Sequence, residues 1–133
     1  MNVFTGEIAA VAVQGSLSLV QVSVGSTRLF AIVIDTPTSA SYLAVGTLVQ
    51  AIFKETEVII GVGADHRVSL QNKLPGSVQS IEAGTLLSRV TLETVAGKVV
   101  SIITTQAVEQ LGLREGTDVT AMIKTNEMML SAC

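Results

Sequence analysis

The sequence predicts an all-β protein built from two copies of one small barrel, each copy carrying one short helix. Three observations support this prediction: an internal repeat, short strands with alternating hydrophobicity, and one helix-like stretch in each copy. The 133 residues are 48% hydrophobic and 14% charged. This composition supplies enough apolar side chains for a core and is too apolar for a disordered chain.

The repeat appears when the chain is shifted by 70 residues against itself without a gap. Identical residues then coincide at many positions, among them Asn2 with Asn72, Gly6 with Gly76, Leu17 with Leu87, Ser18 with Ser88, Leu43 with Leu113, Ala51 with Ala121 and Lys54 with Lys124. A register that holds across a whole half of the chain indicates a duplication. We therefore divide the chain into a first domain of residues 1–62, a linker of residues 63–70 and a second domain of residues 71–133.

Strand patterns dominate both copies. Apolar and other residues alternate over 49–54 and again over 119–124, as they do in a strand with one buried face. Gly15-Ser16 and Gly25-Ser26 are typical of hairpin turns. Between Leu17 and Val24 the apolar residues change parity, which predicts a bulge or a strong twist. Ser18 and Ser88 share a parity with apolar residues, so we expect small, buried side chains bonded to backbone.

The closing strands, 58–60 and 128–130, are apolar on both parities. A strand of a small barrel should have one wet face, so the second face must be covered by the other repeat or by another chain. Domains of about 60 residues are also marginally stable alone. Both points favour oligomerisation.

One short helix is expected in each copy. In the second copy, Ala107, Val108 and Leu111 fall on one helical face, with Thr105 as the N-cap and Gly112 as the stop. In the first copy, Thr36 would be the cap and Pro37 the first helical residue, which would turn Ala40 and Leu43 toward the core.

Composition excludes several classes of function. The net charge of −3 and the 3% aromatic content argue against a nucleic-acid binder. No apolar run is long enough for a membrane span and no signal peptide is visible, so we expect a cytoplasmic protein. The single Cys133 cannot form an internal disulfide, and the single His66 lies in the linker as a solvated loop residue. No catalytic or zinc-binding constellation follows from these residues, and we expect no enzyme.

Lysines and threonines are the best candidates for a binding site. Lys54 and Lys124 occupy the same repeat position at a strand end, where they are either solvated lysines or cations facing a groove between subunits. Thr104 and Thr105 stand at a helix start, where they either cap the helix or help its free amides to hold an anion. Together these groups would form a donor-only site, which suits a tetrahedral oxyanion.

The second copy also resembles a known family. The residues that carry the likeness are Asn72-Lys73-Leu74-Pro75-Gly76, Val78, Ile81-Glu82-Ala83-Gly84, Val90, the run from Ile103 to Leu113, Gly116, Val119, Ala121-Met122-Ile123-Lys124 and Met129-Leu130. They resemble the molbindin (Mop-like, TOBE) family of molybdate- and tungstate-binding domains. The first copy matches more loosely, so the whole chain is similar to a tandem, two-copy molbindin.

The resemblance implies an OB-like five-stranded barrel in each copy, strand exchange between the copies, and a homotrimer of tandem chains. It also implies molybdate or tungstate as the ligand, held at subunit interfaces without catalysis, with no metal bound except as the oxyanion. On the family pattern, the oxyanion-binding residues would be Ser69, Gln71, Asn72, Thr104, Thr105, Ala107 and Lys124, with Lys54 and Asn2 as their remnants in the first copy.

Two departures from the family pattern affect the site. Gln71 stands where the family usually has arginine, so a donor remains but a positive charge is lost. In the first copy, Ile34 replaces the helix-start threonine and Asp35 follows it, and a carboxylate there would repel an anion. We therefore expect the pocket to depend on the second copy more than on the first.

The leading hypothesis is storage or homeostasis of molybdate or tungstate in the cytoplasm. The alternative is a regulatory or protein-interaction module that acts through a partner, such as a molybdate-transport or cofactor-synthesis protein. An OB-fold that binds single-stranded nucleic acid is disfavoured by the acidic balance, and no membrane partner is expected.

Overall fold

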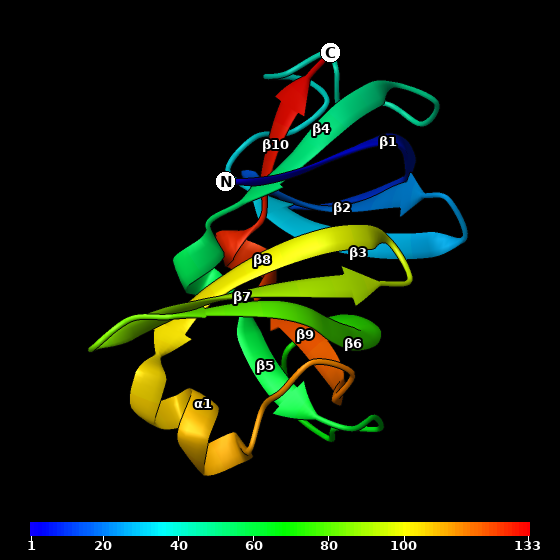
Figure 1. Ribbon diagram of the computed structural model, residues 1–133. Helices are drawn as coiled ribbons and strands as arrows, with labels where there is room; N and C mark the ends of the chain where they lie inside the picture. Colours follow the sequence, from blue (N-terminus) through cyan, green and yellow to red (C-terminus); the bar gives the residue numbers. More distant parts are fainter.

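Two five-stranded antiparallel sheets make up the protein in a computed structural model that describes all 133 residues (Figure 1). The first copy contains β1 (Asn2–Gln14), β2 (Leu17–Val24), β3 (Thr27–Val33), β4 (Leu48–Phe53), the 3-10 turn η1 (Glu55–Glu57) and β5 (Ile59–Val62). The second contains β6 (Asn72–Ala83), β7 (Leu87–Thr94), β8 (Gly97–Thr104), helix α1 (Thr105–Leu111), β9 (Asp118–Ile123), η2 (Thr125–Glu127) and β10 (Met129–Ala132). The predicted all-β class, with its two OB-like barrels, is confirmed.

The last strand of each copy belongs to the sheet of the other copy. The strand orders are β10-β4-β1-β2-β3 and β5-β9-β6-β7-β8. Ile60 of β5 pairs with Ala121 of β9, and Leu130 of β10 pairs with Ala51 of β4. The expected strand exchange is therefore confirmed, and the two copies are interlocked through hydrogen-bonded strands.

This exchange answers how the closing strands are covered. Val58, Ile60 and Met128 are buried against the other repeat. Ile59 and Met129, on the opposite parity, remain 48% and 41% exposed. The other repeat thus covers one face of each closing strand and leaves the second face open.

The core follows the predicted alternation in β4, whereas β9 is buried on both faces, including Thr120 and Met122. Val49, Ala51 and Phe53 are fully buried, and their equivalents in β9 are buried as well. Core residues from both copies form one continuous hydrophobic cluster. Burial of apolar surface across the junction stabilises the pair of barrels together rather than each barrel alone.

The predicted bulge between Leu17 and Val24 is wrong. Strand β2 is regular, and Ser18, Val20, Val22 and Val24 all face the core, while Leu17 and Leu19 lie on the outer face. The register shift occurs instead in the neighbouring strand, between Ile8 and Ala10 of β1 and between Val78 and Ser80 of β6. The prediction failed because Leu17 and Leu19 are apolar although they lie on the outer face, so the apolar residues change parity while the backbone stays regular.

Close backbone approach explains the glycine found just before each shift. A Cβ atom at Gly6 would collide with the backbone of Ser23, and one at Gly76 would collide with the backbone of Glu93. Only glycine allows the strands to come this close, which is why the residue recurs in both copies.

The helix predicted in the first copy is also wrong, because residues 34–47 form turns and bends. The Ser39 hydroxyl contacts the Thr36 amide and the Asp35 carboxylate, so it competes with helical backbone bonding. Tyr42 stands where the second copy has Gly112, and it lacks the left-handed backbone that stops α1. Leu43 is nevertheless buried, as expected, and Ala40 packs against the core.

Residues 63–71 connect β5 to β6 without a helix or strand. His66 is half-buried there and is not the solvated loop residue that we expected. Its imidazole packs over Gly61 beside the Met122 side chain, leaving Nε2 buried without a hydrogen-bond partner. Lys73 Nζ donates a hydrogen bond to the His66 carbonyl at 2.5 Å. No helix in the chain has the length and hydrophobicity required to span a membrane.

Candidate functional site

The helix start is built by Thr104, the last residue of β8. Its backbone is extended (φ −67°, ψ 146°), and its hydroxyl oxygen accepts a hydrogen bond from the Ala107 amide at 3.0 Å. Thr104 is therefore the N-cap, and the prediction of Thr105 is wrong by one residue. The helix stops at Gly112 (φ 63°), as predicted. Because the Thr104 oxygen accepts from Ala107, its hydroxyl proton is left for an acceptor outside the helix.

Thr105 anchors the helix to the barrel. Its hydroxyl donates to the Gly84 carbonyl at 2.7 Å and lies 2.8 Å from the hydroxyl of the buried Ser88. The expected backbone partner is found only in the first copy, where Ser18 donates to the Asp35 carbonyl at 2.6 Å. Thr105 is thus engaged within the fold, whereas the exposed Thr104 faces outward.

The two lysines have matching surroundings. Lys54 follows β4 and Lys124 follows β9, both with extended backbone, and each carbonyl accepts the bond that closes the following 3-10 turn. Both side chains are exposed, and neither takes part in an ion pair. Each lysine therefore presents an ammonium group whose charge no carboxylate of the chain neutralises.

The two asparagines have a different placement from the lysines, because both are buried. The Asn2 amide donates to the Val100 carbonyl and its oxygen accepts from the Val100 amide, both at 2.8 Å. Asn72 does the same with Phe30, at 2.8 Å and 2.7 Å. Each asparagine thus pairs with the edge strand of the other copy.

Ser69 and Gln71 are exposed in the connection that leads into β6. Neither side chain makes a hydrogen bond within the chain. They precede Asn72, and the register of β6 with β9 places Asn72 opposite Ile123, next to Lys124. These residues therefore approach the second lysine.

The turn that follows Lys54 lies beside the strand that ends at Thr104. The turn η1, which Lys54 precedes, packs against β8, and Figure 1 shows it beside the end of β8 from which α1 starts. An ion pair fixes this position, since Arg89 Nη1 lies 3.3 Å from Glu55 Oε1 and Arg89 pairs across the ladder with Ile102. We call Lys54 and Thr104 the first donor group; the Ala107 amide is already bonded to the Thr104 hydroxyl oxygen.

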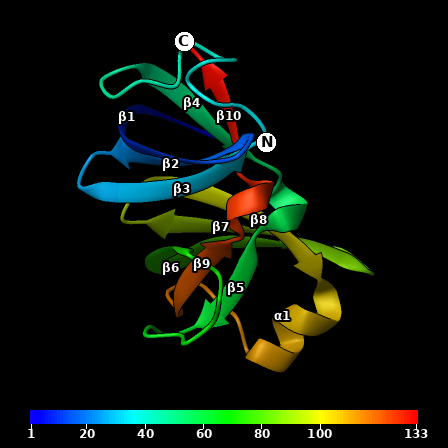
Figure 2. The ribbon, with the colours of Figure 1, turned by 180° about the vertical axis from the view of Figure 1, so that it is seen from behind.

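Lys124 lies beside the first copy instead. The turn η2 packs against β3, as Figure 2 shows from behind. Strand β3 leads into Ile34 and Asp35, which stand where the second copy has its two threonines. We call Lys124, Ser69 and Gln71 the second donor group; Asn72, which is buried and bonded to Phe30, lies beside it. The chain therefore distributes the predicted residues over two groups. The first draws on both copies, and the second combines residues of the second copy and the linker.

The carboxylate near the second group is held by its own loop. Asp35 Oδ1 accepts a hydrogen bond from the Ser39 hydroxyl at 3.0 Å. Burial, and secondarily the charge of Asp35, raises the pKa of the Tyr42 hydroxyl above its ordinary value. Tyr42 therefore stays protonated at neutral pH, and the loop contributes one negative charge beside β3.

Sequence patterns missed the Arg89–Glu55 ion pair. Its side chains are 47% and 18% exposed. Comparison of the two copies could have revealed this ion pair. Arg89 stands where the first copy has Leu19, and the second copy has no acidic residue at the position equivalent to Glu55. The pair adds a guanidinium to the surroundings of the first donor group.

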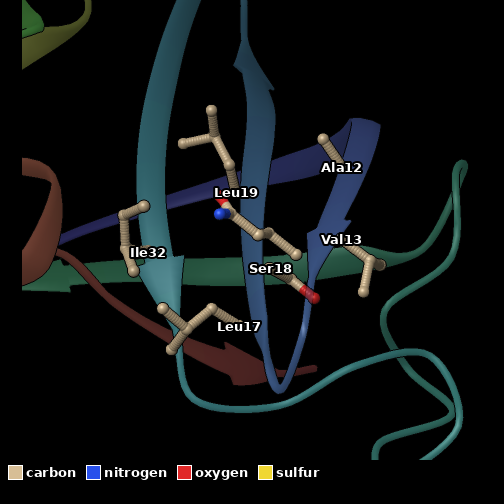
Figure 3. Close-up of a pocket in the computed structure, with 7 residues that line it drawn as sticks. Ala12, Val13, Leu17, Ser18, Leu19 and Ile32 are labelled. Atoms are coloured by element: carbon tan, nitrogen blue, oxygen red, sulfur yellow. The ribbon is translucent and has the colours of Figure 1, made fainter.

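The chain has one pocket, and it lies away from every predicted site residue. It has a volume of about 300 Å³ on the outer face of β1–β3 (Figure 3). It is lined by Ala12, Val13, Gln14, Leu17, Ser18, Leu19 and Ile32. The same face of the second copy carries Glu82 and Arg89 in place of Ala12 and Leu19, so it is less apolar than in the first copy. No group of three or more acidic, histidine or cysteine side chains is placed to hold a metal ion.

Comparisons with known proteins agree with this architecture. A family model described as the TOBE domain matches residues 69–130. Molybdenum-pterin-binding protein 3 of Clostridium pasteurianum is 41% identical over 66 residues, covering 49% of this chain and 97% of that protein. Molybdenum-pterin-binding protein MopB of Rhodobacter capsulatus is 30% identical over 133 residues; the match covers 98% of this chain and 49% of MopB.

A solved structure extends the likeness over both copies. The cytoplasmic molybdate-binding protein ModG, crystallised with molybdate bound, superposes with a TM-score of 0.92 at 32% sequence identity. The match covers 99% of this chain and 96% of ModG. A relative covered over nearly its whole length and a structural match across both copies lead to one conclusion: the chain belongs to the molbindin (Mop-like, TOBE) family, in its form with two repeats.

Proposed function

We propose that this protein binds molybdate without catalysis and serves intracellular storage or homeostasis of the oxyanion in the cytoplasm. The observation that carries the proposal is the first donor group, in which an unpaired lysine lies beside the strand that ends in an exposed N-cap threonine. The relatives named for molybdenum-pterin binding, and ModG with its bound molybdate, support the same ligand.

The chemistry of the first donor group fits a tetrahedral dianion. Molybdate can only accept hydrogen bonds, and Lys54 and Thr104 can each donate one without losing an internal partner. The guanidinium of Arg89 adds positive potential nearby, although Glu55 neutralises part of it. Binding would exchange water around the anion for these fixed donors.

The second donor group is expected to bind more weakly. Lys124 supplies an ammonium group, and Ser69 and Gln71 supply neutral donors. Thr104, which completes the first group, and its neighbour Thr105 are replaced here by Ile34 and Asp35. The hydroxyl is lost and a carboxylate is added beside β3, so the local potential is less favourable for an anion.

We also propose that the anion sits where subunits meet, in a homotrimer. Thr104 and the two lysines are exposed on the single chain, so another subunit is required to shield the ligand from water. Large exposed apolar side chains are available for such contacts, for example Ile34 at 81%, Leu86 at 79% and Val45 at 71%. Tungstate, which has the same charge and shape, should bind in the same way.

Calorimetric titration of the unaltered protein with molybdate, tungstate and sulfate tests this function. We expect saturable heat with molybdate and tungstate, and weaker or no heat with sulfate, which is smaller. Absence of heat with all three anions, together with no molybdenum retained after desalting, would overturn the proposal.

A further inference from the structure

The two buried asparagines have a role that their place in a donor motif does not suggest. A backbone amide and carbonyl on an edge strand normally pair with another strand. At Val100 in β8 and at Phe30 in β3, both groups of the residue are instead satisfied by one asparagine side chain of the other copy, through four hydrogen bonds of 2.7–2.8 Å. The carboxamide thus imitates one residue of a neighbouring strand.

The arrangement is reciprocal. Asn2 and Asn72 occupy the same repeat position, and so do Phe30 and Val100. The first copy therefore holds the second through Asn2, and the second holds the first through Asn72, as in a contact between symmetry-related subunits. Asn2 is 6% exposed and Asn72 is fully buried, so neither amide is presented to a ligand in solution.

Each asparagine also lies next to a lysine. Asn2 is opposite Phe53, the residue before Lys54, and Asn72 is opposite Ile123, the residue before Lys124. The strand that Asn2 holds, β8, ends at Thr104. One asparagine therefore connects the two elements that carry the first donor group.

We propose that Asn2 and Asn72 are positioning residues rather than anion ligands: each fixes a lysine-bearing strand end against the edge strand of the other copy. Asn2 sets the placement of Lys54 relative to Thr104, and Asn72 sets that of Lys124 relative to the end of β3. We call the four hydrogen bonds of these two asparagines the latch. The effect of the latch on ligand affinity rests on the proposed function, but its existence does not.

Amide hydrogen exchange on the ligand-free protein tests the latch directly. In Asn2→Ala the Val100 amide should lose protection by about tenfold or more, the loss of roughly one buried hydrogen bond, while the Phe30 amide keeps its protection. In Asn72→Ala the pattern should reverse, so each variant is the control for the other. Unchanged exchange at Val100 and Phe30 in both variants would overturn the proposal.

The unaltered protein provides a test that does not depend on how well a variant folds. The side-chain amide protons of Asn2 and Asn72 should exchange more slowly than those of Asn126, an exposed asparagine in η2. Equal exchange at all three side chains would contradict the latch.

Molybdate titration separates positioning from direct contact. If Asn2 positions Lys54, affinity and protection of the Val100 amide should fall together in Asn2→Ala. A fall in affinity with unchanged Val100 protection would instead make Asn2 a ligand and overturn the proposal. If the unaltered protein binds no molybdate, the proposed function fails, and the exchange measurements still decide whether the latch exists.

Discussion

Lys54 and Thr104 come from different copies of the repeat, and the packing of η1 on β8 brings their elements together. Each residue was identifiable from the sequence, because lysine recurs at one repeat position and threonine stands at a helix start. The sequence did not show that the elements carrying these two residues meet, because the repeat suggested that Thr104 belongs with Lys124. Which copy faces which depends on strand exchange, a three-dimensional property that the spacing of residues within one copy does not encode.

The role of the asparagines was hidden for a related reason. A motif shows that Asn2 and Asn72 recur, but not whether a carboxamide faces a ligand or a strand. Their partners, Val100 and Phe30, contribute backbone groups only. Backbone partners leave no mark on residue identity, so the sequence could not reveal them.

Replacing Lys54 should weaken molybdate binding more than replacing a lysine elsewhere. We expect Lys54→Ala to reduce affinity about 10- to 100-fold, because a hydrogen bond to a charged group contributes roughly 1.5–3 kcal/mol. Titration calorimetry provides the measurement, with Lys98→Ala as the control, since Lys98 is exposed near the opposite end of β8. Equal effects of the two substitutions would remove Lys54 from the site.

The cap of α1 should depend on the Thr104 hydroxyl. Thr104→Ala removes the acceptor of the Ala107 amide and should cost about 1 kcal/mol of helix stability, whereas Thr104→Ser keeps the hydroxyl. Exchange of the Ala107 amide should accelerate in the alanine variant only, and molybdate affinity should fall in the same variant. If alanine and serine behave alike in both measurements, the hydroxyl has neither role.

At the scale of whole elements, the sequence pattern predicted correctly those features that depend on interactions between residues close in the chain. The strand over 49–54 follows the expected alternation, and the stop of α1 at Gly112 follows the expected backbone preference. The strand over 119–124 forms as expected, but Thr120 and Met122 on its second face are buried as well. The first-copy helix failed because the same core position, filled by Leu43, is reached by turns as well as by a helix. The seryl and threonyl residues around Pro37 bond locally and favour those turns.

The bend of each barrel should depend on the glycine before the register shift. We expect Gly76→Ala to lower the free energy of unfolding by about 1–3 kcal/mol, because the new methyl group would force β6 away from the Glu93 backbone. Urea unfolding measures this change, with Ser77→Ala as the control at the adjacent residue. A wild-type midpoint in Gly76→Ala would show that the strands can separate without cost.

At the scale of the whole molecule, exchange makes the two repeats one folding unit. Each sheet obtains its fifth strand from the other copy, and the hydrophobic cluster is shared. The apolar closing strands indicated that their second face is covered by the other repeat or by another chain. They left open whether the cover came from the same chain, which the pairing of β5 with β9 now answers.

An isolated second copy should therefore not remain monomeric. A fragment of residues 71–133 lacks β5, so the outer edge of β9 would be unpaired, while its own β10 would lack β4. We expect the fragment to dimerise by exchanging β10 between two molecules. Analytical ultracentrifugation at several concentrations measures this, and a stable folded monomer would contradict the requirement for exchange.

The central claim is that interlocked repeats hold molybdate between subunits by donors drawn from both copies. Native mass spectrometry of the unaltered protein and of Lys54→Ala, each with and without molybdate, tests it most directly. We predict a trimeric assembly that retains molybdate, with fewer bound anions in Lys54→Ala at the same assembly mass. A monomer that retains no molybdate, or equal retention by the two proteins, would contradict the account.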